Sequence, residues 1–154
     1  MLYSEPAIFI NFLNLTVVFS KDIYERIVSA KMFMQHHFHE PLGLEAISIQ
    51  ACLSPYHFHR LFNAIYRKTP HQYLTYLRMQ KAKDLLEKEG ISVTDICNDV
   101  GFESITSFSA LFKKQNGHAP QYYRNLAYRK KKLSKEEPKK FVPHCFIQTY
   151  TSGQ

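Results

Sequence analysis

The chain has 154 residues, 45% of them apolar, and a formal net charge of +7, so it can form one ordinary domain or two small lobes with a buried core. Its three cysteines are odd in number and include no Cys-x-x-Cys pair, which argues against a disulfide framework and fits a reducing cytoplasm. The apolar run at residues 6–19 contains two asparagines and has no basic segment before it. It is too short to span a bilayer and lacks the charge pattern of a secretory signal, so we expect a cytoplasmic protein without a membrane partner.

Residues 1–20 form an apolar arm that could become a short strand, a packing arm or no stable structure. After it, apolar side chains recur at the three- and four-residue spacing of helices. The expected helices cover residues 21–39, 43–51, a segment from Ser54 to before Pro70, 71–88, a segment capped by Ser92, 104–117 and 121–127. The last segment, 128–154, is a basic tail with an apolar end.

Part of the chain is repeated about fifty residues later. Ser, Phe, Leu, Phe, Pro and Tyr at positions 54, 58, 61, 62, 70 and 73 recur at 104, 108, 111, 112, 120 and 123. Upstream the offset is one residue shorter, because Ile47, Ala51 and Leu53 correspond to Ile96, Val100 and Phe102. The repeat predicts two helix-turn-helix subdomains, 21–70 and 89–127, joined by a linker helix over 71–88.

Each copy places its second helix in a stretch without acidic residues. Neither residues 54–83 nor residues 104–135 contain Asp or Glu, although both contain several Lys and Arg. A basic surface of this kind favours a polyanionic partner, and we expect double-stranded DNA.

The second helix of the first copy has one face suited to reading bases. If Phe58 and Phe62 face the core, the opposite face carries Tyr56, His59, Arg60 and Asn63. Arg can bind guanine and Asn can bind adenine with two hydrogen bonds each in the major groove. The matching face of the second copy is Thr106, Ser109, Ala110 and Lys113, which is smaller and poorer in such groups. A linker of about 27 Å would set the two faces about one DNA turn apart, within reach of a monomer.

About residues 23–126 resemble the DNA-binding domain of AraC/XylS-type transcription regulators. The resemblance rests on Ser54–Phe62, Pro70-x-x-Tyr73-Leu74, Arg78-Met79-x-x-Ala82-x-x-Leu85-Leu86, Ile96, Gly101-Phe102, Phe108, Phe112-Lys113-Lys114, Gly117 and Pro120-x-x-Tyr123-Arg124. It implies an all-α domain of seven helices whose two recognition helices enter adjacent major-groove segments. The positions it assigns to base reading are Tyr56, His59, Arg60, Ile105, Thr106, Ser109 and Ala110.

We also expect phosphate contacts from Ser54, His57, Ser104, Lys114 and Arg124. Only about twenty residues precede the first helix, so the chain is similar to the short, stand-alone activators of the family, the MarA and SoxS type. No small-molecule effector domain is evident, and RNA polymerase is an expected partner if the protein activates transcription.

The chain departs from the family pattern in two turns. Cys52 stands where a glycine is usual, and Arg67 stands where the second copy has Gly117. A left-handed backbone costs a non-glycine residue about 1–2 kcal/mol, so a local rearrangement of the first lobe is expected. Ala110 occupies a position where the family commonly has Arg, which predicts weaker base reading by the second copy.

Other chemistry finds little support. No catalytic motif is present, so we expect neither an enzyme nor a cofactor. His36 and Glu40 are one turn apart, but a polar helix end is a better interpretation than a metal site. Cys52 and Cys97 are expected to be buried structural thiols. The alternatives left open are a non-specific architectural DNA-binding protein and a metal- or redox-responsive binding module.

Overall fold

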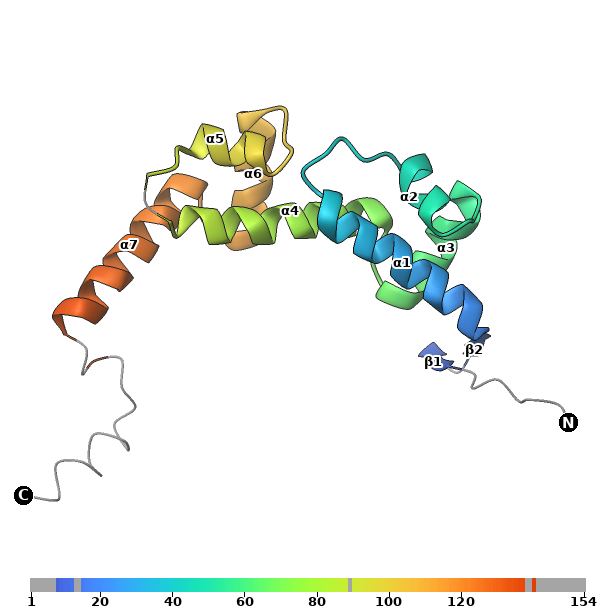
Figure 1. Cartoon of the computed structure of the whole chain (residues 1–154). Coiled ribbons are helices and arrows are strands. Elements are labelled where there is room, and N and C mark those ends of the chain that lie inside the picture. The colour runs from blue at the N-terminus through green and yellow to red at the C-terminus, as the bar shows by residue number, and fades with distance from the viewer. Residues whose placement is uncertain (1–7, 13–14, 89, 138–139, 141–154) are drawn as a thin grey trace, which may run out of the picture. The chain divides into compact units, whose positions relative to one another are not determined.

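The computed structural model describes residues 8–12, 15–88, 90–137 and 140. In this part of the chain, seven helices follow a short hairpin (Figure 1). The elements are β1 (Ile8–Phe12), β2 (Leu15–Phe19), α1 (Lys21–His37), α2 (Leu44–Gln50), α3 (Pro55–Tyr66), α4 (Pro70–Leu86), α5 (Val93–Asp99), α6 (Ile105–Asn116) and α7 (Pro120–Glu136). The predicted all-α domain of seven helices, with two helix-turn-helix units, is confirmed.

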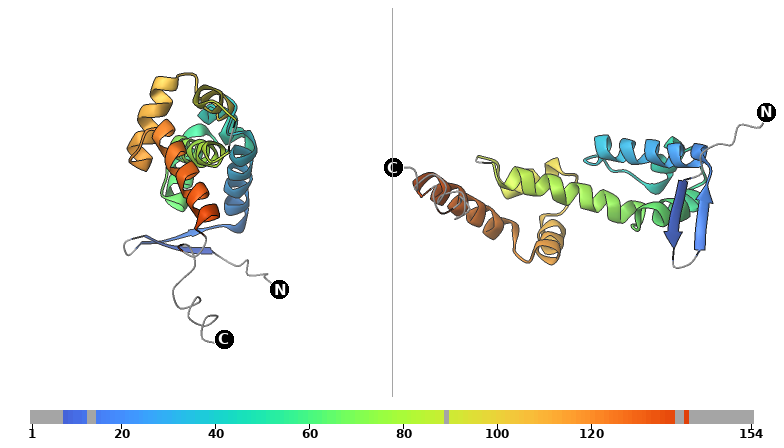
Figure 2. Two further views of the ribbon diagram at one scale, coloured as in Figure 1. Left: turned by 90° about the vertical axis from the view of Figure 1, so that its left-hand side faces the viewer. Right: turned by 90° about the horizontal axis from the view of Figure 1, so that it is seen from below.

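The hairpin is the one β element that the structure describes, and it lies before the helical domain. Its strands pair antiparallel, from Ile8 opposite Phe19 to Phe12 opposite Leu15 (Figure 2). Of the three alternatives for residues 1–20, a strand is therefore the one adopted. No helix among the described residues is long and apolar enough to cross a membrane.

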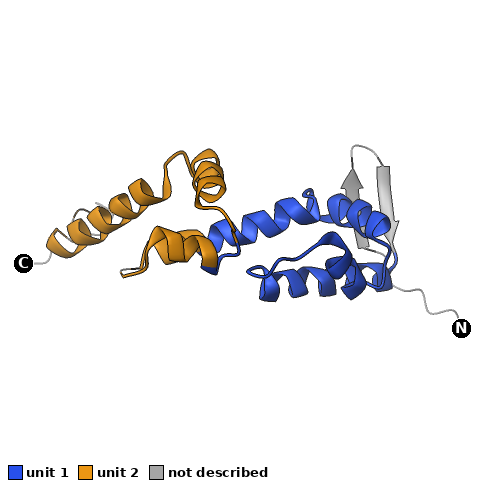
Figure 3. Ribbon diagram, turned by 90° about the horizontal axis from the view of Figure 1, so that it is seen from above, with its two compact units in different colours: residues 1–81, 99–101 blue, residues 82–98, 102–154 orange. Residues whose placement is uncertain are grey.

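The chain divides into two compact units, shown in different colours in Figure 3. Unit 1 comprises residues 1–81 and 99–101, and unit 2 comprises residues 82–98 and 102–154. The centre of unit 1 is formed where α1, α2, α3 and the first half of α4 bury one face each. Its buried cluster is Ile27, Ala30, Met34, Ile47, Ala51, Phe58, Phe62, Tyr73 and Leu74.

The repeated aromatic residues form the same chain of rings in each unit. In unit 1, the ring of Phe62 lies 5.4 Å from that of Phe58 and 5.5 Å from that of Tyr73. In unit 2, the corresponding distances from Phe112 are 5.8 Å to Phe108 and 5.5 Å to Tyr123. All four phenylalanines are fully buried, so the repeat in the sequence is a repeat of core packing.

The linker helix α4 begins with a reciprocal cap. The amide of Gln72 donates to the hydroxyl of Thr69, and the amide of Thr69 donates to the side-chain oxygen of Gln72. Pro70 occupies the first turn, where its missing N–H costs no hydrogen bond. The predicted inward stripe of this helix is buried or half-buried at each of its six positions, Leu74, Leu77, Met79, Ala82, Leu85 and Leu86.

Helix α7 is longer than the sequence predicted. A short helix over 121–127 was expected, followed by a solvated charge run, but the helix continues to Glu136. Lysine and arginine are good helix formers, and neither glycine nor proline interrupts the run before residue 138. A Lys132–Glu136 ion pair one turn apart, at 3.8 Å, adds modest support. The apolar residues 141–150 lie outside the described part of the chain.

Candidate nucleic-acid interface

In unit 1 the turn between α2 and α3 is a regular left-handed helix ending. The amide of Cys52 donates to the carbonyl of Ile49 at 2.9 Å, and the amide of Leu53 donates to that of Ser48 at 3.2 Å. These two bonds define a Schellman motif, which requires a left-handed residue after the cap. Cys52 fills that position with φ of 51°. Arg67, which ends α3, is also left-handed, with φ of 56°.

The expected rearrangement of the first lobe is therefore wrong. Both non-glycine residues adopt the left-handed conformation, because the backbone bonds and the buried helices on either side fix the path of the chain. The predicted burial of Cys52 is also wrong, since this turn position directs its side chain outward and the thiol is exposed. Cys97 is buried as predicted, and burial raises the pKa of its thiol. Cys145 lies outside the described residues.

We expect Cys52→Gly to raise the free energy of unfolding by about 0.5–1 kcal/mol. Glycine removes the left-handed strain of about 1–2 kcal/mol but adds conformational freedom to the unfolded chain. Urea unfolding midpoints measure the difference. Cys52→Ala is the matched control, because it deletes the same thiol and keeps the strain. Equal stability of the two variants would contradict the prediction.

Unit 2 has the same turn with a glycine in it. The amide of Phe102 donates to the carbonyl of Cys97 at 3.0 Å, and Gly101 takes the left-handed position with φ of 84°. A serine then begins the second helix in each unit. Ser54 accepts a hydrogen bond from the amide of His57, and Ser104 accepts one from the amide of Ser107, both at 3.4 Å.

The predicted ridge of α3 lies on the surface of unit 1. Tyr56 is 73% exposed, Arg60 and Asn63 are exposed, and His59 is half-buried. The guanidinium carbon of Arg60 lies 5.7 Å from the centre of the Tyr56 ring. A cation over an aromatic face is held in place at modest energy, so the ring restricts the orientations of the arginine.

The predicted ridge of α6 is also on the surface of its own unit. Thr106, Ala110 and Lys113 are exposed and Ser109 is half-buried. Ile105, assigned only through the family resemblance, is 40% exposed. This ridge offers hydroxyls, methyl groups and one cation, which suit thymine methyls and phosphates better than two-bond base reading.

Four of the five residues predicted to contact phosphate are exposed, namely Ser54, His57, Ser104 and Lys114. Arg124 differs from them. It is half-buried, and its Nε and Nη2 atoms are covered and have no hydrogen-bond partner. Its predicted phosphate contact is untested, but this geometry favours a different role.

Backbone amides at the start of α6 were not identified from the sequence. The cap of Ser104 engages the amide of Ser107, which leaves the amides of Ile105 and Thr106 at the open end of the helix. The corresponding first residue of α3 is Pro55, which has no N–H. The signal was present in the sequence as this Pro-to-Ile difference, and it adds a second phosphate donor to α6 only.

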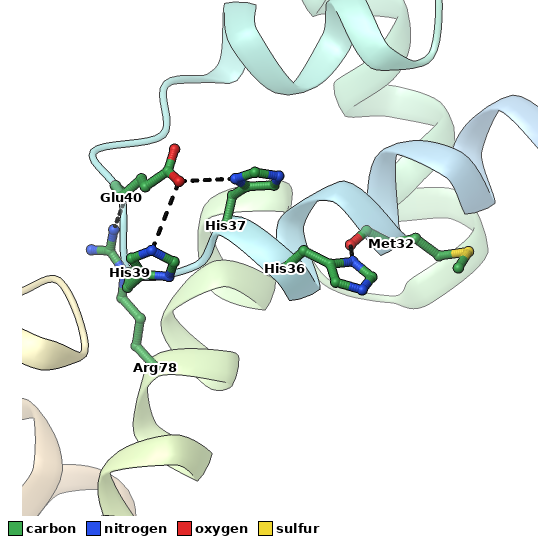
Figure 4. A network of polar contacts seen from close by, with 6 residues as sticks. All are labelled: Met32, His36, His37, His39, Glu40 and Arg78. Atoms are coloured by element: carbon green, nitrogen blue, oxygen red, sulfur yellow. Dashed lines mark hydrogen bonds and ion pairs between the residues drawn. The ribbon is translucent and has the colours of Figure 1, made fainter.

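The histidine cluster after α1 is a set of polar contacts within unit 1 (Figure 4). His36 does not pair with Glu40, because its Nδ1 lies 2.7 Å from the carbonyl of Met32. Glu40 instead contacts Nδ1 of His37 at 2.9 Å, and this hydrogen bond lowers the pKa of its carboxyl group. Among the described residues, no group of three or more His, Cys, Asp or Glu side chains could hold a metal ion.

The same loop is held by two long-range contacts. Arg78 of α4 donates from Nε to the carbonyl of Phe38 at 2.7 Å and from Nη2 to that of Glu40 at 2.8 Å. Gly101 lies against His39 so closely that a Cβ atom would come within 2.5 Å of its carbonyl oxygen. These contacts fix the end of α1, which packs against α2 and α3.

Comparison with known proteins identifies the relatives of this arrangement. A family model described as a helix-turn-helix domain matches residues 47–126. The HTH-type transcriptional regulator AlkR of Acinetobacter baylyi is 36% identical over 85 residues, which are 55% of this chain and 28% of that protein. The HTH-type transcriptional activator RhaS of Escherichia coli O157:H7 is 34% identical over 89 residues, 58% of this chain and 32% of RhaS. The chain thus spans about a third of the length of these curated relatives.

Solved structures show the same fold. The DNA-binding domain of AdpA, a global transcriptional factor solved in complex with a target DNA, superimposes with a TM-score of 0.63 at 26% identity. The match covers 73% of this chain and 96% of that one. The C-terminal domain of AraT, a response regulator from Geobacillus stearothermophilus, matches with a TM-score of 0.64 at 28% identity, over 68% of this chain and 87% of that domain.

Proposed function

Because the chain belongs to the AraC-type family of helix-turn-helix proteins, we propose that it is a sequence-specific, DNA-binding transcription regulator and not an enzyme. The observation that carries this proposal is the exposed polar ridge on the second helix of each unit, within a stretch of chain that has no acidic residue. The relative AdpA was solved with its target DNA, which supports double-stranded DNA as the partner.

The two ridges divide the work of recognition in this proposal. Tyr56, His59, Arg60 and Asn63 read base edges, and Arg60 makes the most selective contact because its guanidinium group can bind guanine O6 and N7 together. Ile105, Thr106, Ser109, Ala110 and Lys113 add methyl, hydroxyl and phosphate contacts. A monomer would read two adjacent major-groove segments without a palindrome.

Action as an activator is the finer part of the proposal. RhaS is named as a transcriptional activator, and this chain shares about a third of its residues with RhaS over the matched region. Contact with RNA polymerase would follow from activation. A regulator of bacterial type acts where the chromosome is, so we place the protein in the cytoplasm.

Selection from a random oligonucleotide pool tests the proposal directly. We expect a recovered motif with two half-sites about ten base pairs apart, the spacing of one helical turn. A pool that shows affinity but yields no motif would support a non-specific architectural protein instead. The smaller ridge of α6 and the basic second half of α7 are the features that favour this second function.

Replacing Arg60 with alanine should weaken binding to the selected site by about 1–3 kcal/mol and relax the preference at one base pair. Fluorescence anisotropy on the selected and on random duplexes, each over a range of salt concentrations, measures both effects. The matched control is Lys114→Ala, which should weaken both duplexes alike and reduce the salt dependence. An equal loss on both duplexes for Arg60→Ala would make Arg60 a phosphate contact only.

A further inference from the structure

Arg124 of α7 has an unusual environment within unit 2. Its Nε and Nη2 atoms are both covered by neighbouring atoms, and neither has a hydrogen-bond partner. These two nitrogens form one edge of the guanidinium plane, the edge that binds a carboxylate or a phosphate through two parallel hydrogen bonds. Unpaired charged donors in a protein interior are expensive, so this pair calls for an acceptor.

A cavity lies beside this side chain. It has a volume of about 200 Å³ and lies between the end of α4 and the first three turns of α7. It is lined by Leu86, Glu87, Lys88, Gly90, Arg124, Asn125, Tyr128 and Lys131. Water takes about 30 Å³ per molecule in the liquid, so the cavity has room for a small oxyanion and several water molecules.

The charges around the cavity favour an anion. Three of the lining side chains are cationic, Lys88, Arg124 and Lys131, and one is anionic, Glu87. One oxygen of Glu87 already accepts a hydrogen bond from the hydroxyl of Tyr123, at 3.1 Å. The lining therefore keeps an excess of positive charge, and the amide of Asn125 and the hydroxyl of Tyr128 add neutral donors.

We propose that this cavity binds a small oxyanion, a carboxylate or a phosphate, whose oxygens accept from Nε and Nη2 of Arg124. Since both nitrogens are covered, the guanidinium group must rotate about its last side-chain bonds to present this edge, and the neighbouring cavity gives it the space to do so. The bound anion would join α7 to the end of the linker helix and stabilise unit 2. This role is independent of DNA binding, because none of the lining residues belongs to the α3 or α6 ridge.

The test uses the full chain with inorganic phosphate, acetate or chloride at matched ionic strength. Thermal unfolding and isothermal titration calorimetry are compared for the unchanged protein, Arg124→Gln and Arg129→Gln. The last variant is the matched control, because it removes the same charge from an exposed position on the same helix. At one hundred times Kd, phosphate or acetate should raise Tm by about 5–10 °C over chloride in the unchanged protein and in Arg129→Gln. Arg124→Gln should lose this rise.

The two anions distinguish the ligand. A rise with phosphate alone indicates a phosphoryl compound, and a rise with acetate alone indicates a carboxylate. An equal rise in Arg124→Gln would place the binding on the exposed basic surfaces or in bulk solvent effects, and would overturn the proposal. So would the absence of any rise with either anion.

Lys88→Gln keeps the proposal testable if Arg124→Gln does not fold. It removes one cation from the cavity at an exposed position, and should weaken the binding of the same anion about 3–10-fold at low salt. NMR shifts of the Tyr128 ring and the Asn125 side-chain amide on titration should locate the anion at the cavity. Unchanged affinity together with unshifted resonances would refute the site.

Discussion

Replacing Gly101 with alanine is expected to lower the free energy of unfolding by about 2–4 kcal/mol. The φ of 84° at this position costs an alanine about 1–2 kcal/mol. In addition, the new Cβ would lie 2.5 Å from the carbonyl oxygen and 2.9 Å from the carbonyl carbon of His39. Since both atoms belong to the backbone, the loop after α1 must move to make space, and forced shifts of this kind add a further 1–3 kcal/mol or so. Chemical denaturation followed by circular dichroism measures the loss.

Gly117→Ala is the control that separates strain from contact. Gly117 has a similar φ of 78°, but no atom lies within 4 Å of the position of its Cβ. This variant should therefore lose only the conformational part, about 1–2 kcal/mol. If the two alanine variants are equally stable, the close approach of Gly101 to His39 does not exist in solution.

Replacing Arg78 with glutamine is expected to cost about 2–4 kcal/mol of stability. Its guanidinium group donates to the carbonyls of Phe38 and Glu40, forty and thirty-eight residues away in the chain. Hydrogen bonds from a charged donor contribute about 1.5–3 kcal/mol each when they are shielded, and less where water reaches them. The positive charge also lies near the carbonyl end of α1, where it opposes the helix dipole.

Arg78→Lys separates charge from geometry. Lysine keeps the positive charge but cannot hold two carbonyls with one planar group, so it should recover only part of the loss. Urea unfolding of the three proteins under the same buffer conditions provides the comparison. A lysine variant as stable as the unchanged protein would show that the charge alone matters and that the paired bonds do not.

The features predicted most accurately are those that depend on neighbours in sequence. Serine caps, first-turn prolines and the spacing of the repeated phenylalanines act over three to ten residues, and each could be recognised from the printed chain. The placement of Tyr56 and Arg60 on the surface followed directly from the burial of Phe58 and Phe62 on the other side of one helix. Helix boundaries differed by one or two residues at most of the other ends.

The errors lie where distant segments meet or where propensity competes with charge. Cys52 was expected to be buried because small residues often pack in such turns, but the left-handed backbone directs its side chain outward. The approach of Gly101 to His39 joins residues about sixty positions apart, and no local pattern announces it. The pairing of His37 with Glu40, in place of His36 with Glu40, depends on how the chain leaves α1. The length of α7 was underestimated because charge repulsion was given more weight than helix propensity.

The helical second half of α7 has a consequence for the kinetics of association. Successive residues of a helix are rotated by about 100°, so the cations from Arg129 to Lys135 point in all directions around one rod. A polyanion is attracted to such a rod from any side, which accelerates the first encounter without favouring one docked orientation. The rate of capture and the choice of sequence are thereby assigned to different parts of the molecule, and either one can change without altering the other.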